Sequence, residues 1–212
     1  MKFTAIMTII FSISISLGNV NAQTNEIKIS KLILNKKEKK VFSSRDSSAH
    51  IYIDTLIMND RSSLQFFGKK DVKISVGYAE IGHRVFISGI AGKNNASNFD
   101  LDFNFGKLGS LYIVARGQDA NNGMKTDPNG DAGNINLVYN AQSVVPQTED
   151  KKGKNYLHTD VNPGGLRVIP TSDLRNIYDQ IKRSAPGLRG VPQGQIYSGS
   201  IGKEGKVTIS SK

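Results

Sequence analysis

The chain has 212 residues, a net charge of +10 and no cysteine. Without cysteine there is no disulfide framework, no thiolate nucleophile and no thiolate zinc site. The length suffices for one β-domain with its own core. The excess of lysine and arginine suits an anionic partner. Because the sequence contains no phosphate-binding loop and no nucleic-acid-binding module that we recognise, we expect that partner not to be nucleic acid.

Residues 1–22 have the features of a signal peptide. Lys2 precedes an apolar run that continues to Leu17, and the stretch ends with small residues up to Ala22. Serines interrupt the run, whereas a membrane-spanning helix needs about 20 predominantly apolar residues. We therefore expect export to the periplasm, the outer-membrane surface or the cell surface. The mature chain is expected to begin at Gln23 and to have no transmembrane segment.

Residues 49–139 carry most of the core-forming side chains, in short segments where apolar and polar residues alternate. Residues 26–34 are compatible with an opening strand of the same kind. Strands at this density, with no helical pattern between them, predict an all-β body. The clearest alternations are Val72, Ile74, Val76 and Tyr78, and then Phe99, Leu101, Phe103 and Phe105.

Two architectures fit these strands. Residues 55–66 and 72–77 resemble the coils of secreted bacterial parallel β-helix proteins. This resemblance implies a β-solenoid, in which polar corners join short strands and stacked coils bury one face of each strand. An antiparallel β-sandwich also fits strands that recur roughly every 8 to 12 residues. We favour the solenoid, because the tight hairpin signals Asn-Gly and Asp-Gly are absent from the strand junctions.

The composition changes after Tyr139, where proline and charged residues replace the alternating pattern. We predict that this change marks a linker between the β-rich domain and a smaller C-terminal part. The predicted divisions are a signal peptide at 1–22, a β-rich domain at 23–141, a linker at 142–155, and C-terminal strands plus a helix at 156–212.

The C-terminal part contains one amphipathic helix pattern, at residues 171–185. Leu174, Ile177 and Ile181 fall on one helical face, and Pro186 ends the pattern. An amphipathic helix must bury its apolar face. We expect this helix to pack on the β-domain, where it would cover an open end or edge.

The stretch at residues 117–134 is rich in glycine, asparagine and aspartate, which favour turns. We expect a long surface loop whose deletion leaves the thermal transition nearly unchanged, and we consider it a candidate binding loop. Oxygen-bearing side chains at alternate positions of this stretch also suit calcium. However, Ala132 stands where an EF-hand loop has glycine, and no glutamate closes the loop. We therefore expect no cofactor. The candidate binding residues are Asp119, Asn121, Asn122, Asp127, Asn129 and Asp131, of which Asp127, Asn129 and Asp131 are the calcium candidates.

Other candidate chemistry is scattered. The three histidines, His50, His83 and His158, are far apart in the sequence, and no catalytic residue stands out. Asp100 and Asp102 alternate with core residues, which predicts that they face solvent. Tyrosine rings could form a sugar-binding platform, but nothing in the sequence groups them. The tyrosines considered are Tyr112, Tyr139, Tyr156 and Tyr197.

These observations favour a non-enzymatic exported protein that acts by binding. We expect an accessory subunit of a cell-envelope assembly or a surface structural module, with an envelope or outer-membrane protein as its partner. The alternative is a carbohydrate-active protein that binds or cleaves an anionic polysaccharide. The lysine-rich run at residues 36–40 has two interpretations. It is either a solvated turn or a sheet edge whose charges prevent edge-to-edge pairing, or it is part of a polyanion-binding site.

Overall fold

A computed structural model describes residues 26–120, 128–166 and 201–212, and all regular elements in them are β-strands. They wind into a parallel β-solenoid, which confirms the predicted fold class and rules out the antiparallel sandwich for this part of the chain. The predicted helix at 171–185 lies outside the described residues. No helix long and apolar enough to cross a membrane occurs within the described ranges.

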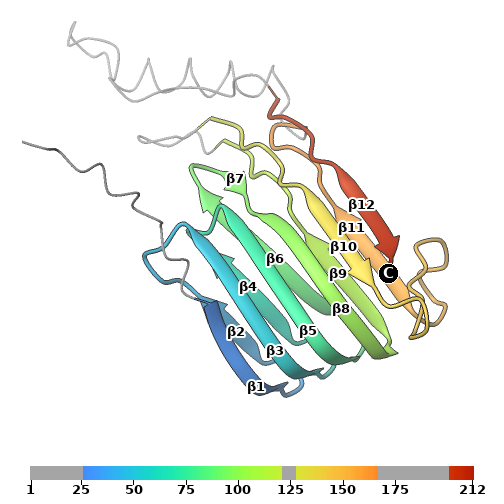
Figure 1. The fold of residues 1–212 in the computed structure, drawn as a ribbon. Helices are drawn as coiled ribbons and strands as arrows, with labels where there is room; N and C mark the ends of the chain where they lie inside the picture. Colours follow the sequence, from blue (N-terminus) through green and yellow to red (C-terminus); the bar gives the residue numbers. More distant parts are fainter. Residues whose placement is uncertain (1–25, 121–127, 167–200) are drawn as a thin grey trace, which may run out of the picture.

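The strands form two sheets, and each coil runs from one sheet to the other (Figure 1). Within both sheets all neighbours are parallel, and only the short β7 (Asn95–Ala96) pairs antiparallel, with β6. Sheet A is ordered β1 (Glu26–Leu34), β3 (Ser48–Met58), β5 (Asp71–Ile81), β8 (Asn98–Leu108), β10 (Ile135–Tyr139) and β12 (Val207–Ser211). Sheet B is ordered β11 (Tyr156–Asp160), β9 (Ser110–Val114), β6 (Val85–Gly92), β4 (Ser63–Phe67) and β2 (Lys39–Phe42).

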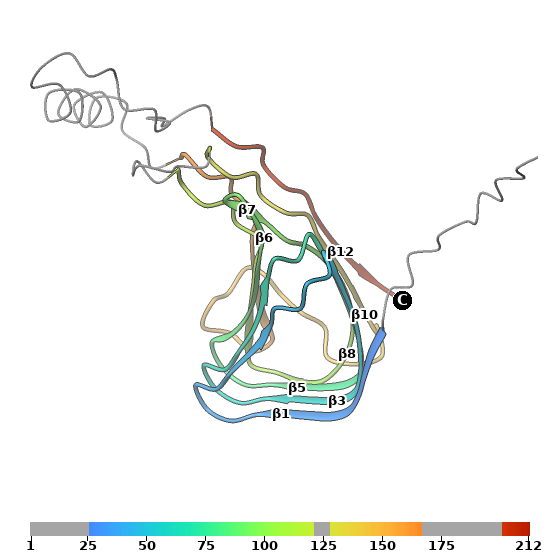
Figure 2. The same cartoon turned by 90° about the vertical axis from the view of Figure 1, so that its left-hand side faces the viewer.

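The long strands of sheet A bend, so the solenoid has a roughly triangular outline when viewed end-on (Figure 2). In β3, buried side chains alternate up to Ile53 and resume at Leu56, so the inward parity shifts by one residue at the bend. Gly77 lies at the corresponding bend of β5, where an added Cβ would lie 2.9 Å from the carbonyl oxygen of Asp54. The parity change that is visible in the sequence is thus a corner of the solenoid.

The core consists of rows of like side chains, because the parallel register stacks equivalent positions of successive coils. One row contains Ile51, Ile74, Leu101 and Leu137, all 3% exposed or less. Aromatic rings fill the space between the sheets, with Phe66 packed edge-on to Phe99 at 6.0 Å between centroids. Burial of these apolar rows is the main source of stability of the fold.

A buried lysine closes one corner of the solenoid. The side chain of Lys69 is 1% exposed and its ammonium group donates to the carbonyl oxygen of Ser44 at 3.0 Å, to the Ser44 hydroxyl, and to the carbonyl oxygen of Asp46. These three acceptors replace the hydrogen bonds to water that the ammonium group loses on burial. Lys69 therefore ties the connection between β2 and β3 to the next coil.

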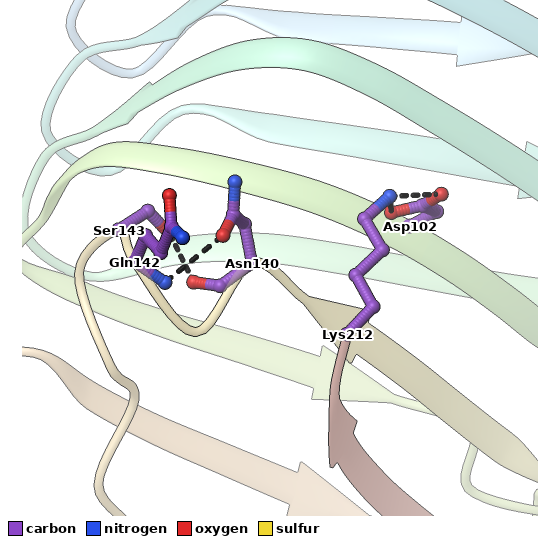
Figure 3. A network of polar contacts seen from close by, with 5 residues as sticks. All are labelled: Asp102, Asn140, Gln142, Ser143 and Lys212. Carbon is purple, nitrogen blue, oxygen red and sulfur yellow. Dashed lines mark hydrogen bonds and ion pairs between the residues drawn. The ribbon is translucent and has the colours of Figure 1, made fainter.

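The later strands join the same two sheets. The connection predicted as a linker, residues 142–155, runs from β10 in sheet A to β11 in sheet B. It is tied to the solenoid at both ends, because Val144 N donates to Phe105 O at 3.1 Å and Leu157 N donates to Gln147 O at 2.8 Å. Lys212, directly after β12 at the edge of sheet A, reaches across β10 to the carboxylate of Asp102 (Figure 3).

Candidate functional site

An aromatic row lies on the outer face of sheet B. The register aligns Phe86 of β6 with Tyr112 of β9, and Tyr112 with His158 of β11. Phe86 and Tyr112 stack at 5.0 Å between centroids with an interplanar angle of 23°, and Tyr112 lies 5.5 Å from the His158 ring. The Phe86 side chain is 38% exposed. Parallel pairing has thus built a continuous aromatic track along the solenoid axis from residues that are distant in sequence.

Tyr156 supports this row from one side. It is 7% exposed and packs edge-on against Tyr112 at 5.9 Å, while its ring stacks with His158 at 6.4 Å. The Tyr156 hydroxyl and His158 Nδ1 lie 3.5 Å apart. These contacts hold the Tyr156 ring against Tyr112 and His158 on one side of the row.

A groove of about 470 Å³ follows the same face toward the carboxyl ends of β4, β6 and β9. Its lining combines the half-exposed ring of Phe67 with the polar side chains of Gln65, Ser88, Arg116 and Asp119. Aromatic faces beside amide, hydroxyl, guanidinium and carboxylate groups offer both apolar stacking and hydrogen bonds to a ligand rich in hydroxyl groups.

Arg116 is held at the wall of this groove by Asp160. The guanidinium and carboxylate groups lie 3.9 Å apart, with side-chain exposures of 28% and 18%. A guanidinium group has five N–H donors in a planar fork, so one distant carboxylate leaves donors that can face a ligand. The pair thus fixes the position of Arg116 without occupying its whole hydrogen-bonding capacity.

The predicted binding loop is partly built into the solenoid. Asp119 Oδ1 accepts a hydrogen bond from Gly165 N at 2.7 Å, and Asn129 Oδ1 accepts one from Ala120 N at 2.7 Å. Asp131 Oδ1 accepts one from Lys203 N at 2.7 Å. The structure therefore uses three of the candidate side chains to bridge backbone segments. The other candidates, Asn121, Asn122 and Asp127, lie outside the described residues.

Glycines pack these segments against one another. Gly130 N donates to Gln118 O, and Gly130 O accepts from Gly164 N, both at 2.9 Å. Gly117 and Gly202 each approach the carbonyl of Gly130 so closely that neither position has room for a Cβ. We call the segments 115–119, 128–134, 161–165 and 201–206 the glycine bundle. The expectation that residues 117–134 form only a surface excursion is therefore wrong for the described ends of that stretch.

Among the described residues, no group of three or more histidine, aspartate or glutamate side chains lies close enough to hold a metal ion. His50 is on sheet A, His83 at a corner and His158 on sheet B, so the fold does not bring the histidines together. The two described calcium candidates, Asn129 and Asp131, use their side-chain oxygens for the backbone N–H groups named above.

Sheet A carries a second, charged groove of about 310 Å³ on its outer face. Lys73 and Asp100 lie there at 4.0 Å, and Asn136 donates to Asp100 at 2.9 Å. The carboxylates of Asp100 and Asp102 are 52% and 42% exposed, which confirms that both face solvent. Because Lys73 and Asp100 already pair with each other and the described lining of this groove holds no exposed aromatic row, we place the candidate site on sheet B.

The fold brings together two of the four tyrosines considered for a sugar-binding platform. Tyr112 and Tyr156 meet on sheet B, whereas Tyr139 is on β10 of sheet A, half-buried against the core, and Tyr197 lies outside the described residues. Sequence reasoning missed Phe86 as a surface ring and Arg116 as part of the groove on the same sheet. Aligning the coils on their buried positions would have found Phe86, since it occupies the same outward position as Tyr112.

Asp60 and Tyr78 each have a pKa that a local hydrogen bond shifts from its ordinary value. The backbone N–H of His83 donates to the Asp60 carboxylate at 2.8 Å and lowers the pKa of Asp60. A hydrogen bond from the Tyr78 hydroxyl to Glu80 at 2.9 Å raises the pKa of Tyr78. Neither group lies in the aromatic row or in the groove beside it, so these shifts belong to other parts of the surface.

Comparison with known proteins gives no relative from which a role could be transferred, since the chain matches no family model, no curated protein and no solved structure.

Proposed function

We propose that this protein is exported and binds a polysaccharide along the outer face of sheet B, without cleaving it. The aromatic row of Phe86, Tyr112 and His158 carries this proposal. Because Phe86 and Tyr112 stack on each other, the row presents mainly its ring edges to a ligand. The C–H face of a pyranose ring packs against this apolar ridge, while its hydroxyl groups form hydrogen bonds beside it.

The spacing of the row supports an extended chain as the ligand. Neighbouring rings lie 5.0 and 5.5 Å apart, because each belongs to a successive parallel strand. This spacing is close to the length of one pyranose unit in an extended polysaccharide. The groove beside the row, with Gln65, Ser88 and Arg116, supplies donors and acceptors for the hydroxyl groups.

A second candidate is the role of an accessory subunit that binds an envelope protein through the same face. Exposed apolar side chains favour it, since Val41, Phe67 and Phe86 are 45%, 42% and 38% exposed on neighbouring strands of sheet B. A protein partner would bury these side chains together. The aromatic row favours the polysaccharide, because its rings are stacked in a line rather than spread over a patch.

The test is affinity electrophoresis of the chain from Gln23 through gels that contain neutral or anionic polysaccharides. We expect retardation by at least one of them. The double variant Phe86→Ala/Tyr112→Ala should weaken binding on the order of a hundredfold, taking roughly tenfold for each stacked ring.

Tyr52→Ala is the matched control, because Tyr52 is 39% exposed on the outer face of sheet A, away from the row. It should leave binding unchanged. Equal loss in both variants, or no retardation by any polysaccharide, would contradict the proposal. Recovery of a stoichiometric envelope protein that the double variant no longer binds would establish the second candidate instead.

A further inference from the structure

A line of cations runs along the corner that leads from sheet A into sheet B. Lys37, Arg61 and Arg84 occupy equivalent positions there, each two residues before the aligned residues Lys39, Ser63 and Phe86 of sheet B. Backbone bonds hold the corners in register, since Lys37 N donates to Asp60 O at 3.0 Å and Arg61 N donates to His83 O at 2.8 Å. We call these three residues the corner ridge.

The corner ridge has an unusual backbone conformation. Lys37, Arg61 and Arg84 have φ values of 65°, 61° and 56°, in the left-handed region that glycine and asparagine adopt more readily. Long basic side chains at all three positions thus cost backbone free energy that asparagine would largely avoid. The corner turn alone therefore does not explain their presence.

The charges of the corner ridge also repel one another. Successive parallel strands are about 4.8 Å apart, so each cation has a like charge one coil away. All three side chains are exposed, and Lys36 lies beside them. Two acids lie next to the ridge. Glu38 follows Lys37 in the same turn, where its carboxylate accepts the Asn35 N–H at 2.7 Å. Asp60 precedes Arg61, and Lys36 and Arg61 both help to lower the pKa of Asp60 after the larger effect of the His83 N–H.

The corner ridge leads directly into the aromatic row. Arg84 is two residues before Phe86, and the row continues from Phe86 to Tyr112 and His158 on later coils. The ridge precedes β2, β4 and β6, and the aromatic row lies on β6, β9 and β11, two residues further along the chain in each coil. The two lines therefore run parallel to the solenoid axis and overlap at the coil of Arg84 and Phe86. In Figure 1 these coils follow one another from the blue end of the solenoid.

We infer that the ligand is a linear anionic polysaccharide with about one carboxylate or sulfate group per sugar unit, and that the corner ridge binds these groups. The inference rests on the proposed polysaccharide binding and adds the charge of the ligand and its direction along the axis. Ion pairs with a regularly charged polymer would relieve the repulsion within the ridge, with one cation per coil facing about one sugar unit.

The test compares two triple variants of the chain from Gln23. Lys37→Asn/Arg61→Asn/Arg84→Asn removes the ridge charges while suiting the left-handed turns. Lys151→Asn/Lys152→Asn/Lys154→Asn removes the same charge from exposed positions of the connection between β10 and β11. Binding is measured to polygalacturonate, to heparin, to neutral hydroxyethylcellulose and to single-stranded DNA, over a range of salt concentrations.

We expect the ridge variant to bind polygalacturonate or heparin roughly 10- to 100-fold more weakly, with a reduced salt dependence and an unchanged or higher melting temperature. The control variant should bind like the wild type. Equal losses in both variants would show attraction by net charge alone and would overturn the inference. Equally tight binding to DNA, lost in the same variant, would also overturn it, since the ridge would then accept any polyanion.

The two proposals fail in different ways. If Phe86→Ala/Tyr112→Ala abolishes binding and the ridge variant does not, the polysaccharide site stands and the inference about charge is wrong. If the ridge variant alone loses binding to the anionic polymers, the corner ridge stands and the aromatic row is not part of the site.

Discussion

Replacing Gly130 with alanine tests whether the glycine bundle is part of the folded structure or a loop that the fold could lose. A Cβ at this position would overlap the carbonyl oxygen of Asn94 and would lie 2.9 Å from Asn95 N. Both neighbours are backbone atoms, so no side-chain rotation relieves the overlap. One of the two segments must therefore move.

The cost follows from the hydrogen bonds that such a movement breaks. Gln118 N donates to Asn94 O at 2.8 Å, Gly130 N to Gln118 O at 2.9 Å, and Gly164 N to Gly130 O at 2.9 Å. At roughly 0.5–1.5 kcal/mol for each bond, the loss of these three bonds predicts a fall in unfolding free energy of about 2–4 kcal/mol. For a chain of this size, each kcal/mol lowers the melting temperature by roughly 2–4 °C.

The assay is urea denaturation followed by circular dichroism, with Gly68→Ala as the control. Gly68 has a positive φ of 71°, which Gly130 does not, but an added Cβ at Gly68 meets no atom within 4 Å. The control should lose only about 1 kcal/mol, from backbone strain. If the two variants lose equal free energy, the segments around Gly130 are not packed against one another, and the original expectation of a dispensable loop would be right.

Three further variants test individual contacts. Lys69→Met should lower the unfolding free energy by about 1–3 kcal/mol, because it removes three charge-assisted hydrogen bonds while the acceptors regain water. If the variant is more stable than the wild type, these hydrogen bonds do not offset the cost of burying the charge. Asp60→Asn keeps an oxygen for the His83 N–H but removes the carboxylate whose folded pKa is lowered. Above the ordinary pKa of aspartate, the wild type should therefore be more stable than the variant. This advantage should disappear as pH falls through the lowered pKa of Asp60, as measured by denaturation at a series of pH values. A difference in unfolding free energy that does not change with pH would contradict this. Lys212→Ala removes the exposed ion pair with Asp102 and should cost less than about 1 kcal/mol in the same assay; a larger loss would mean that the pair holds β12 in place.

The core could be read from the sequence because burial alone sets the pattern there. The alternation from Val72 to Val76 and from Phe99 to Phe105 predicted inward side chains, and these are buried. Tyr78, which continues the first alternation, is instead 42% exposed, because the inward parity shifts at the bend after Val76. Even the parity change after Ile53 was visible, although only the structure shows that it is a bend. Such patterns are local, so one strand is enough to reveal them.

The candidate site could not be read in the same way, because parallel register creates it. Phe86 and Tyr112 are neighbours only once β6 and β9 are paired, and no local pattern predicts that pairing. The sequence pattern around Asp131 suggested a calcium ligand for a related reason. Its alternate spacing with Asn129 resembles a cation loop, whereas its carboxylate accepts the Lys203 N–H of a distant segment. A short polar side chain has the same sequence signature in both roles.

The corner turns explain another difference between expectation and structure. The lack of Asn-Gly pairs at these corners argued against hairpins, which is correct, since the corners connect two different sheets. The left-handed residue that such a turn needs is nevertheless present, as Lys37, Arg61 and Arg84. Propensity alone would not place lysine or arginine there.

The register of the strands also sets the order in which the solenoid can assemble. Bonds between the early coils join residues only 23 to 27 positions apart, whereas β12 reaches β10 across 72 positions. Closing a loop about three times as long costs roughly 1 kcal/mol more in chain entropy. The coils from β3 to β8 are therefore the natural nucleus, from which folding spreads to both ends. The last strand docks on an edge that already exists, so a chain still being synthesised could complete most of its core before β12 is made.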